Sequence, residues 1–357
     1  MFQTINEAIA FHNFIRYKKF INNRIFPTVN FVMIDENYFG GNKMSDSKLK
    51  DLGNPLRDVK KSFDELIIPH RQDLWRYCFR ITGSPWDAED LVQETLIKAF
   101  SSLSQLWQPI NPKGFLFRIA SNTWIDQCRK AKMKLDSSVN IETELASNEN
   151  IINFEVNEAL QQLVIHLPPR QRVVLLLIDV FQFKAKEVGG MIGTTEGAVK
   201  ALLKRARVKL EQVSNVEEYK TNSVSLTEEQ YKIIGMYIEC FNRRDPDGIA
   251  KLMDDTITND IVHIAQEYGK DTVRHNSLTD WAKDPVEMKA ELHELWGRPT
   301  IVQLAKYEDT YVIYDLNLVE FEGNKIVKQK DYYFCPELLS KAGEELQMRA
   351  YPRKYTL

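Results

Sequence analysis

Apolar and polar positions repeat with helical spacing through the middle of the chain. The clearest stretch is Lys184–Glu211, KAKEVGGMIGTTEGAVKALLKRARVKLE. It predicts two helices joined at Gly193, with Thr195 capping the second because its hydroxyl can accept a free backbone N–H. The second helix carries one apolar stripe made of Val199, Leu202, Leu203, Ala206 and Leu210. Two helices around a short glycine turn are typical of a helix-turn-helix, whose second helix enters the DNA major groove.

The outer face of that second helix is basic. Lys200, Lys204 and Arg207 follow one another at helical spacing, with Arg205 and Lys209 beside them. A solvated helix hairpin and a DNA-reading helix both fit this pattern. The segments upstream favour the DNA-reading interpretation.

Three further helices are predicted upstream. The second of them is acidic on its outer face and the third is basic. A capping box at Ser62 opens the segment before Gly83, and Ser84-Pro85 starts the next helix. That helix buries Leu91 and Val92 and carries an acidic stripe on its other face. The stripe consists of Asp87, Asp90 and Glu94, with Gln93 beside them. It fits either a basic partner or a solvated face.

A proline-rich loop, residues 107–114, precedes a basic aromatic helix, FLFRIASNTWIDQCRKAKMK. Leu116 and Ala120 belong to its inward stripe. Its remaining faces combine amide, aromatic and cationic side chains: Arg118, Asn122, Trp124, Arg129 and Lys130. Rings that stack on bases and cations that hold phosphates suit separated DNA strands.

The last third of the chain has a different pattern. An amphipathic helix is predicted over Thr227–Asn242, with Tyr231, Ile234 and Phe241 on its core side. Alternating strands follow, and Glu322-Gly-Asn324 marks a hairpin turn. Helices followed by an antiparallel curved sheet predict an α+β cone.

Composition narrows the class of protein. The 357 residues carry 47 basic and 50 acidic side chains, a net charge of −3, so nucleic-acid binding must come from local patches. No apolar run is long enough for a membrane helix, and the spacing of the four cysteines suggests neither a disulfide framework nor a metal site. We therefore expect a cytoplasmic protein with no cofactor, no metal and no membrane partner.

The segments DAEDLVQETLIKAF, FLFRIASNTWIDQCR and EVGGMIGTTEGAVKALLKRARVKL stand in the order seen in bacterial sigma factors. The chain resembles the extracytoplasmic-function (ECF) group of the sigma-70 family, which keeps regions 2 and 4. Its closing segment, YVIYDLNLVEFEGNKIVKQKDYYF, resembles the SnoaL-like group of the nuclear-transport-factor-like fold. The expected fold is therefore multidomain: two all-α sigma domains, a region 2 helical bundle and a region 4 helix-turn-helix, followed by an α+β cone-shaped SnoaL-like domain.

The resemblance implies how the chain divides. From the residues themselves, we expect an N-terminal extension over 1–60 that is disordered or results from a start placed too early, with Met44 as the native start. Region 2 would span 61–133, a flexible linker 134–152, region 4 153–214 and the SnoaL-like domain 224–357.

The resemblance also implies roles for residues. The residues expected to dock on the β′ clamp helices of core RNA polymerase are Asp87, Asp90, Gln93 and Glu94. Those expected at the promoter −10 element are Arg118, Asn122, Trp124, Arg129 and Lys130. Those expected at the −35 element are Thr195, Glu196, Lys200, Lys204, Arg205 and Arg207. Ala201-Leu202 departs from the Ser-Arg of many relatives, which puts the −35 sequence in doubt.

The expected function is promoter recognition by RNA polymerase, with the C-terminal domain regulating it in cis. An anti-sigma factor or a small ligand of that domain is a further expected partner. Two alternatives stay open: a ligand-responsive helix-turn-helix regulator without a sigma role, and an enzyme that uses the cone. An enzyme needs an acid or base in the cone, for which His263, Asp260, Asp315 and Asp331 are available.

Overall fold

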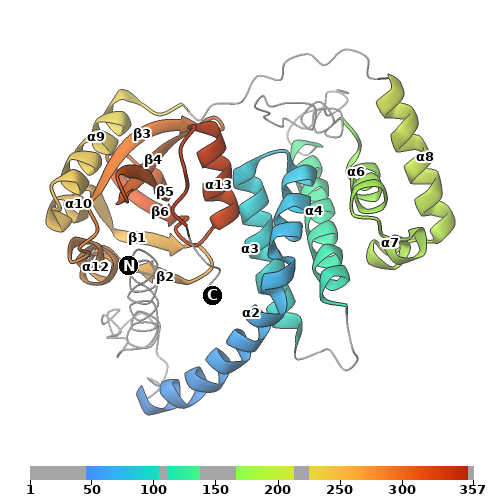
Figure 1. Ribbon diagram of the computed structural model, residues 1–357, viewed down its shortest axis with the longest axis horizontal. Coiled ribbons are helices and arrows are strands. Elements are labelled where there is room, and N and C mark those ends of the chain that lie inside the picture. Colours follow the sequence, from blue (N-terminus) through green and yellow to red (C-terminus); the bar gives the residue numbers. More distant parts are fainter. Residues whose placement is uncertain (1–45, 104–110, 137–165, 213–224, 353–357) are drawn as a thin grey trace. The chain divides into compact units, whose positions relative to one another are not determined.

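The computed structural model describes residues 46–103, 111–136, 166–212 and 225–352 (Figure 1). The chain divides into two compact units, Met1–Glu65 and Leu66–Leu357. Several expectations lie outside the described residues: the start at Met44, the first part of the 107–114 loop, the linker from 137 on, and region 4 before His166.

The first described helix, α2, runs over Asp46–Thr82 and belongs to both units. The expected helix start at Ser62 is therefore wrong, as is the expectation that residues 46–60 lack regular structure. The capping box lies inside a continuous helix, which runs on through Gly53 and Pro55. The same sequence pattern can cap a helix or simply occur within one.

Two helices after α2 complete the helical bundle. α3 (Pro85–Ser102) begins as predicted, since the Ser84 side chain accepts a hydrogen bond from the Asp87 N–H at 3.3 Å. α4 (Pro112–Asp136) begins earlier than predicted. The Asn111 side chain accepts from the Gly114 N–H at 3.2 Å, so an Asn-Pro pair starts this helix.

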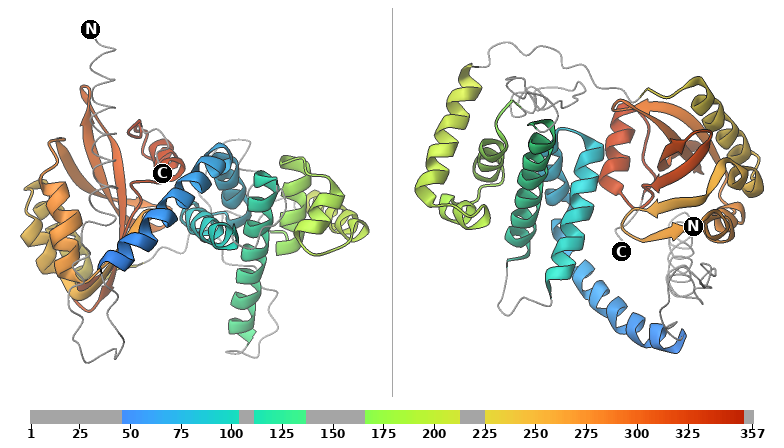
Figure 2. Two further views of the ribbon diagram at one scale, coloured as in Figure 1. Left: turned by 90° about the horizontal axis from the view of Figure 1, so that it is seen from below. Right: turned by 180° about the vertical axis from the view of Figure 1, so that it is seen from behind.

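The helix-turn-helix forms as predicted. α6 (Pro169–Leu175) continues into a π-helical turn, η2 (Leu176–Val180), and α7 (Ala185–Met191) and α8 (Glu196–Gln212) follow. Gly193 adopts a φ of 65°, and the Thr195 hydroxyl accepts from the Ala198 N–H at 3.2 Å. Val199 and Ala206 are buried, which confirms the apolar stripe. These helices gather into one group in both views of Figure 2.

The C-terminal domain is the expected α+β cone. α9 (Glu228–Asn242) and α10 (Pro246–Leu252) cover one face of a curved sheet (Figure 1). The six strands run in the order β2-β1-β6-β5-β4-β3. Their bounds are β1 Met253–Ile261, β2 Ala265–Tyr268, β3 Met288–Leu295, β4 Arg298–Tyr307, β5 Thr310–Glu322 and β6 Lys325–Asp331. Between β2 and β3 lie α11 (Lys270–Val273), η3 (Arg274–Leu278) and α12 (Thr279–Ala282).

The predicted hairpin is confirmed, because Glu322 pairs with Lys325 around a turn in which Gly323 has a φ of 56°. The elements that were not predicted are β2, the short helices between β2 and β3, strand β3, and helix α13 (Pro336–Glu345), which covers the other face of the sheet. Tyr231 is exposed instead of buried, since α9 turns Ile233 and Tyr237 inward. Among the described helices, none combines the length and apolarity needed to cross a bilayer.

Candidate functional site

The acidic face of α3 meets basic side chains of the cone. Lys330 Nζ of β6 lies 2.8 Å from Asp90 Oδ1, and Arg298 Nη2 at the start of β4 lies 3.7 Å from Asp87 Oδ1. Both carboxylates remain partly open to solvent. The side chains expected to dock on polymerase are therefore covered in part by the C-terminal domain.

The other two residues expected to dock on polymerase contact only neighbouring helical residues. Glu94 pairs with Lys98 on its own helix at 2.6 Å and accepts a hydrogen bond from Gln127 of α4 at 2.7 Å. Gln93 is half-buried. The structure thus brings the four residues to one helix, and only its first turns contact the cone.

Trp86 anchors the contact between α3 and the cone. Its side chain is 1% exposed, and its ring N–H donates to the Leu295 carbonyl at 3.2 Å. The ring centroids of Trp296 and Tyr332 each lie 5.1 Å from that of Trp86. Because these partners come from residues far along the chain, the pattern around Trp86 alone did not predict its burial.

A buried ionic network lies beside Trp86. Arg71 of α2 donates to Glu89 Oε1 at 3.1 Å and to Glu337 Oε2 of α13 at 3.3 Å. Trp75 donates to Glu89 Oε2 at 2.8 Å, and His263 contacts Glu89 Oε1. Removing one partner of such a buried pair is strongly destabilising, by about 3–5 kcal/mol, because an uncompensated charge is left behind.

The network sets the charge of its members. Burial alone would raise the pKa of Glu89, but the hydrogen bond and charge of His263 and the charge of Arg71 lower it to about 2. Burial, followed by the charge of Arg71, lowers the pKa of His263. Glu89 is therefore ionised at neutral pH, with the imidazole as a donor to it.

The basic aromatic helix α4 is partly covered by the helix-turn-helix unit. The Asn122 side-chain amide donates to the Met191 carbonyl at the end of α7, at 2.9 Å. Trp124 is 4% exposed, and the guanidinium of Arg172 lies 5.0 Å from its ring centroid. In this arrangement the ring of Trp124 is covered, and the amide of Asn122 is bound to the backbone of α7.

Aromatic packing reinforces that contact. Phe117 of α4 is fully buried, and its ring lies 4.9 Å from Phe181 and 5.4 Å from Phe183. Arg172 also donates to the Ile81 carbonyl at 2.8 Å. The remaining −10 candidates lie on the surface: Arg118 and Lys130 are exposed, and Arg129 pairs with Asp126 at 3.1 Å.

The outer face of α8 is open to solvent. Lys204 and Arg205 are exposed, and Lys200 pairs with Glu196 at 2.6 Å along the helix. Arg207 forms two hydrogen bonds to Asp179, at 2.6 and 3.1 Å, which hold it toward η2. Thr195 serves as the helix cap. The structure thus places Lys204 and Arg205 where phosphates could approach most freely.

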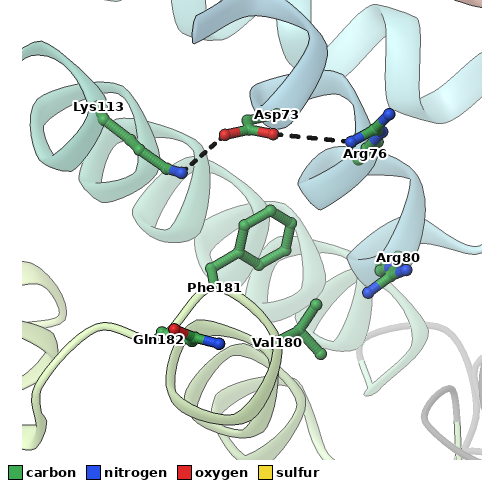
Figure 3. Close-up of a pocket in the computed structure, with 7 residues that line it drawn as sticks. All are labelled: Asp73, Arg76, Arg80, Lys113, Val180, Phe181 and Gln182. Atoms are coloured by element: carbon green, nitrogen blue, oxygen red, sulfur yellow. Dashed lines mark hydrogen bonds and ion pairs between the residues drawn. The ribbon is translucent and has the colours of Figure 1, made fainter.

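A cavity of about 330 Å³ opens between α2, α4 and the end of η2 (Figure 3). Asp73 bridges Lys113 at 2.7 Å and Arg76 at 3.9 Å, and Arg80 and Phe181 line the same space. Cations outnumber the one carboxylate, so the cavity is basic. It lies at the junction of the two helical parts.

The acid–base candidates of the cone do not form one group. Asp331 accepts from Gln329 at 2.8 Å and from Asn317, and Asp315 lies near Asn317 at 3.4 Å. Burial raises the pKa of Asp331 to about 7. His263, in contrast, contacts Glu89 of the bundle. The polar interior is thus built from carboxylates and amides.

These features define a class of protein: two helical parts, one with a helix-turn-helix, joined to an α+β domain. Residues 66–133 match Sigma-70 region 2, and residues 157–210 match Sigma-70, region 4. The chain is 32% identical over 144 residues to the ECF RNA polymerase sigma factor SigL of Mycobacterium tuberculosis, which covers 39% of this chain and 80% of SigL. The chain belongs to the ECF sigma factors of the sigma-70 family.

Two other relatives are longer or more distant. SigG of Mycobacterium tuberculosis, also an ECF RNA polymerase sigma factor, is 31% identical over 225 residues, 56% of this chain. The chain covers 60% of the length of SigG. The crystal structure of Mycobacterium tuberculosis SigJ aligns over 76% of this chain and 94% of its own, with 18% identity and a TM-score of 0.30.

Proposed function

We propose that the protein is a sigma factor that binds core RNA polymerase through the acidic face of α3 and reads promoter DNA through α4 and α8. In this role it acts in the cytoplasm as a binding protein without chemistry of its own. The docking residues are Asp87, Asp90, Gln93 and Glu94. The described conformation is its closed, inactive form.

The observation that carries this proposal is the pairing of Asp90 with Lys330 and of Asp87 with Arg298. A polymerase surface that recognises these carboxylates must itself be basic, because opposite charges define such a face. The cone, as part of the same chain, therefore presents an equally basic surface to these carboxylates. Polymerase and cone compete for one helix face.

The contact of α4 with the helix-turn-helix unit supports a second form of inhibition, which acts on DNA binding. Asn122 and Trp124, expected at the −10 element, contact Met191 and Arg172 instead. Promoter recognition requires both parts to separate so that each reaches its own DNA element. Opening of the cone and separation of the helical parts are thus two steps toward activity.

Energies of a few kcal/mol decide this competition. Exposed ion pairs contribute about 0–1 kcal/mol each, whereas burial of a large ring contributes about 2–3 kcal/mol. A closed form favoured by about 2.7 kcal/mol lowers the apparent affinity for polymerase about 100-fold. Burial of Trp86 therefore contributes most of the free energy that favours the closed form, and the two ion pairs contribute the rest.

A small polar ligand of the cone is a further part of the proposal. Asp331, Asn317 and Gln329 form a polar group inside the cone, beside β1 and β5. A ligand that rearranged β6 would move Lys330, the neighbour of Asp331, away from Asp90. An anti-sigma factor that binds the closed form would act in the opposite direction.

Reconstitution tests the proposal. Purified full chain is mixed with core polymerase, and binding and promoter-dependent transcription are measured, with a K330E/R298E variant in parallel. We expect weak binding by the wild type and stronger binding and transcription by the variant. Absence of core binding by both forms would defeat the sigma assignment, and equal binding would defeat the closed form.

A further inference from the structure

Three side chains with metal-binding atoms meet where α3 joins the cone. The Glu89 carboxylate, the His263 imidazole and the Cys335 thiol offer one atom each, and all three atoms lie within 4.8 Å of one another. They come from α3, from the turn after β1 and from the residue before α13. Spacing along the sequence could not predict this group, because only folding brings the three together.

The group is shielded from water. The Glu89 and Cys335 residues are fully buried, and the His263 side chain is 4% exposed. Four ligands around zinc lie about 2.0–2.3 Å from the metal and hence roughly 3.5 Å from one another. The three atoms lie within 4.8 Å of one another, so shifts of the side chains alone bring them to that spacing. Imidazole, thiolate and carboxylate are the ligands that zinc accepts together.

Surrounding residues hold the ligands in place. Arg71 and Trp75 hold the two oxygens of Glu89 from the bundle side, and His263 lies against Oε1. His263 has a φ of 71°, a left-handed conformation that is uncommon for residues other than glycine. Supporting hydrogen bonds and locally unfavourable backbone are both frequent at ligand-binding sites.

The charges leave room for a cation. Arg71 faces two carboxylates, Glu89 and Glu337, at 3.1 and 3.3 Å. With an uncharged imidazole and thiol, the buried group carries a net charge of −1. Binding of Zn²⁺ replaces the thiol proton, which leaves to solvent as the Zn–S bond forms. The resulting net charge is zero, which removes an unfavourable buried charge.

We propose that Glu89, His263 and Cys335 bind one Zn²⁺ ion, with water as the fourth ligand, and that this ion ties the cone to α3. The proposal is independent of polymerase binding, since it concerns contacts within this chain alone. Zinc would strengthen the closed form, because its ligands belong to both sides of the contact. Loss of zinc would release the cone.

Cobalt is the probe that tests the site. The full chain is stripped with a chelator and titrated with Co²⁺, and absorption is followed in the near ultraviolet and the visible. We expect one equivalent to give a thiolate-to-cobalt charge-transfer band and the strong visible bands of a tetrahedral site, both removed by Zn²⁺. C335S should lose the charge-transfer band, and H263N should bind at least about tenfold more weakly. C240S, at a buried thiol elsewhere in the cone, should behave as wild type.

A second measurement covers variants that fold poorly. Zn²⁺ should raise the melting temperature of the wild type and of C240S, but not that of H263N, whose asparagine accepts the left-handed backbone. Circular dichroism establishes that each variant is folded. A missing cobalt band in the wild type, a band that persists in C335S, or equal stabilisation of all variants by Zn²⁺ would overturn the site.

Discussion

The ammonium nitrogen of Lys330 lies 2.8 Å from Oδ1 of Asp90, although 240 residues separate the two along the chain. This pair places a cone strand on the helix face that region 2 is expected to present to polymerase. Substitutions that change the charge of either residue can therefore test whether the closed form exists.

Neutralising the cone side of the contact should strengthen polymerase binding. In K330A/R298A, both ion pairs to α3 are lost, while Asp87 and Asp90 stay in place. We expect core affinity to rise about three- to tenfold, which corresponds to about 0.7–1.4 kcal/mol. Fluorescence anisotropy with labelled protein measures it. K328A is the matched control, since Lys328 pairs with Glu320 inside the sheet at 3.0 Å; an equal gain in K328A would contradict the prediction.

Reversing the charge of Asp90 should separate the two effects of this residue. D90R repels Lys330 and so opens the cone, yet it also removes a carboxylate that we propose binds polymerase. We expect core binding to fall at least about tenfold with the fold intact. In D90R/K330D the internal ion pair returns, but core binding should not. Normal core binding by D90R would show that the acidic face is not the docking surface.

Truncating Trp86 should weaken the whole contact. W86A removes a buried ring and its hydrogen bond to Leu295, and we expect a loss of about 3–5 kcal/mol in the free energy of unfolding. W86F keeps most of the ring volume and should lose less. Urea denaturation followed by circular dichroism measures both. A loss below about 1 kcal/mol for W86A would mean that the ring is not an anchor.

Lysine and arginine on α8 should differ in their effect on DNA binding. Lys204 is free to contact a phosphate, so K204A should lower the slope of log affinity against log salt by about 0.9. Lys200 should behave similarly once it leaves Glu196. Arg207 is held by Asp179, so R207A should change the slope less. Binding to promoter DNA by the polymerase complex, measured over a salt series, distinguishes the three. Equal slopes in K204A and the wild type would place Lys204 away from DNA.

Stability should fall as pH rises through the acidic range. Burial, followed by the nearby carboxylates Glu267 and Asp260, raises the pKa of Asp331 from 3.8 to about 7. Between these values the folded protein keeps a proton that the unfolded chain releases. The free energy of unfolding should therefore decrease from pH 4 to pH 7 by up to about 1.4 kcal/mol per pH unit and level off above. D331N should lack this contribution. Urea denaturation from pH 5 to 8 measures it, and parallel curves for both proteins would contradict the prediction.

Local chemistry made much of the helical fold predictable. The cap at Ser84, the turn at Gly193 and the apolar stripe through Val199 all depend on residues close by in the sequence. The pattern of apolar and polar residues therefore predicted them. The start of α2 did not follow, because a capping-box sequence at Ser62 also fits the middle of a helix. Strand β3 was missed for a similar reason, since charged residues such as Lys289 and Glu291 alternate along it on an exposed face.

Contacts between distant segments were out of reach. Nothing near Trp86 in the sequence indicates that Trp296 and Tyr332 cover it. From its sequence context, Trp124 was expected to stack on the bases of a separated DNA strand. In the structure, Arg172 and the helix-turn-helix unit cover its ring. The sequence therefore predicts which surfaces bind partners, whereas the fold reveals which of them are covered.

The order of synthesis gives the Glu89–His263 contact a further consequence. A ribosome makes the two helical parts before it reaches His263. The C-terminal domain, residues 225–357, then takes roughly 7–25 s at typical elongation rates. During that interval the acidic face of α3 has no cone to cover it. We therefore expect a newly made chain to present this acidic face more openly than a chain in the closed form.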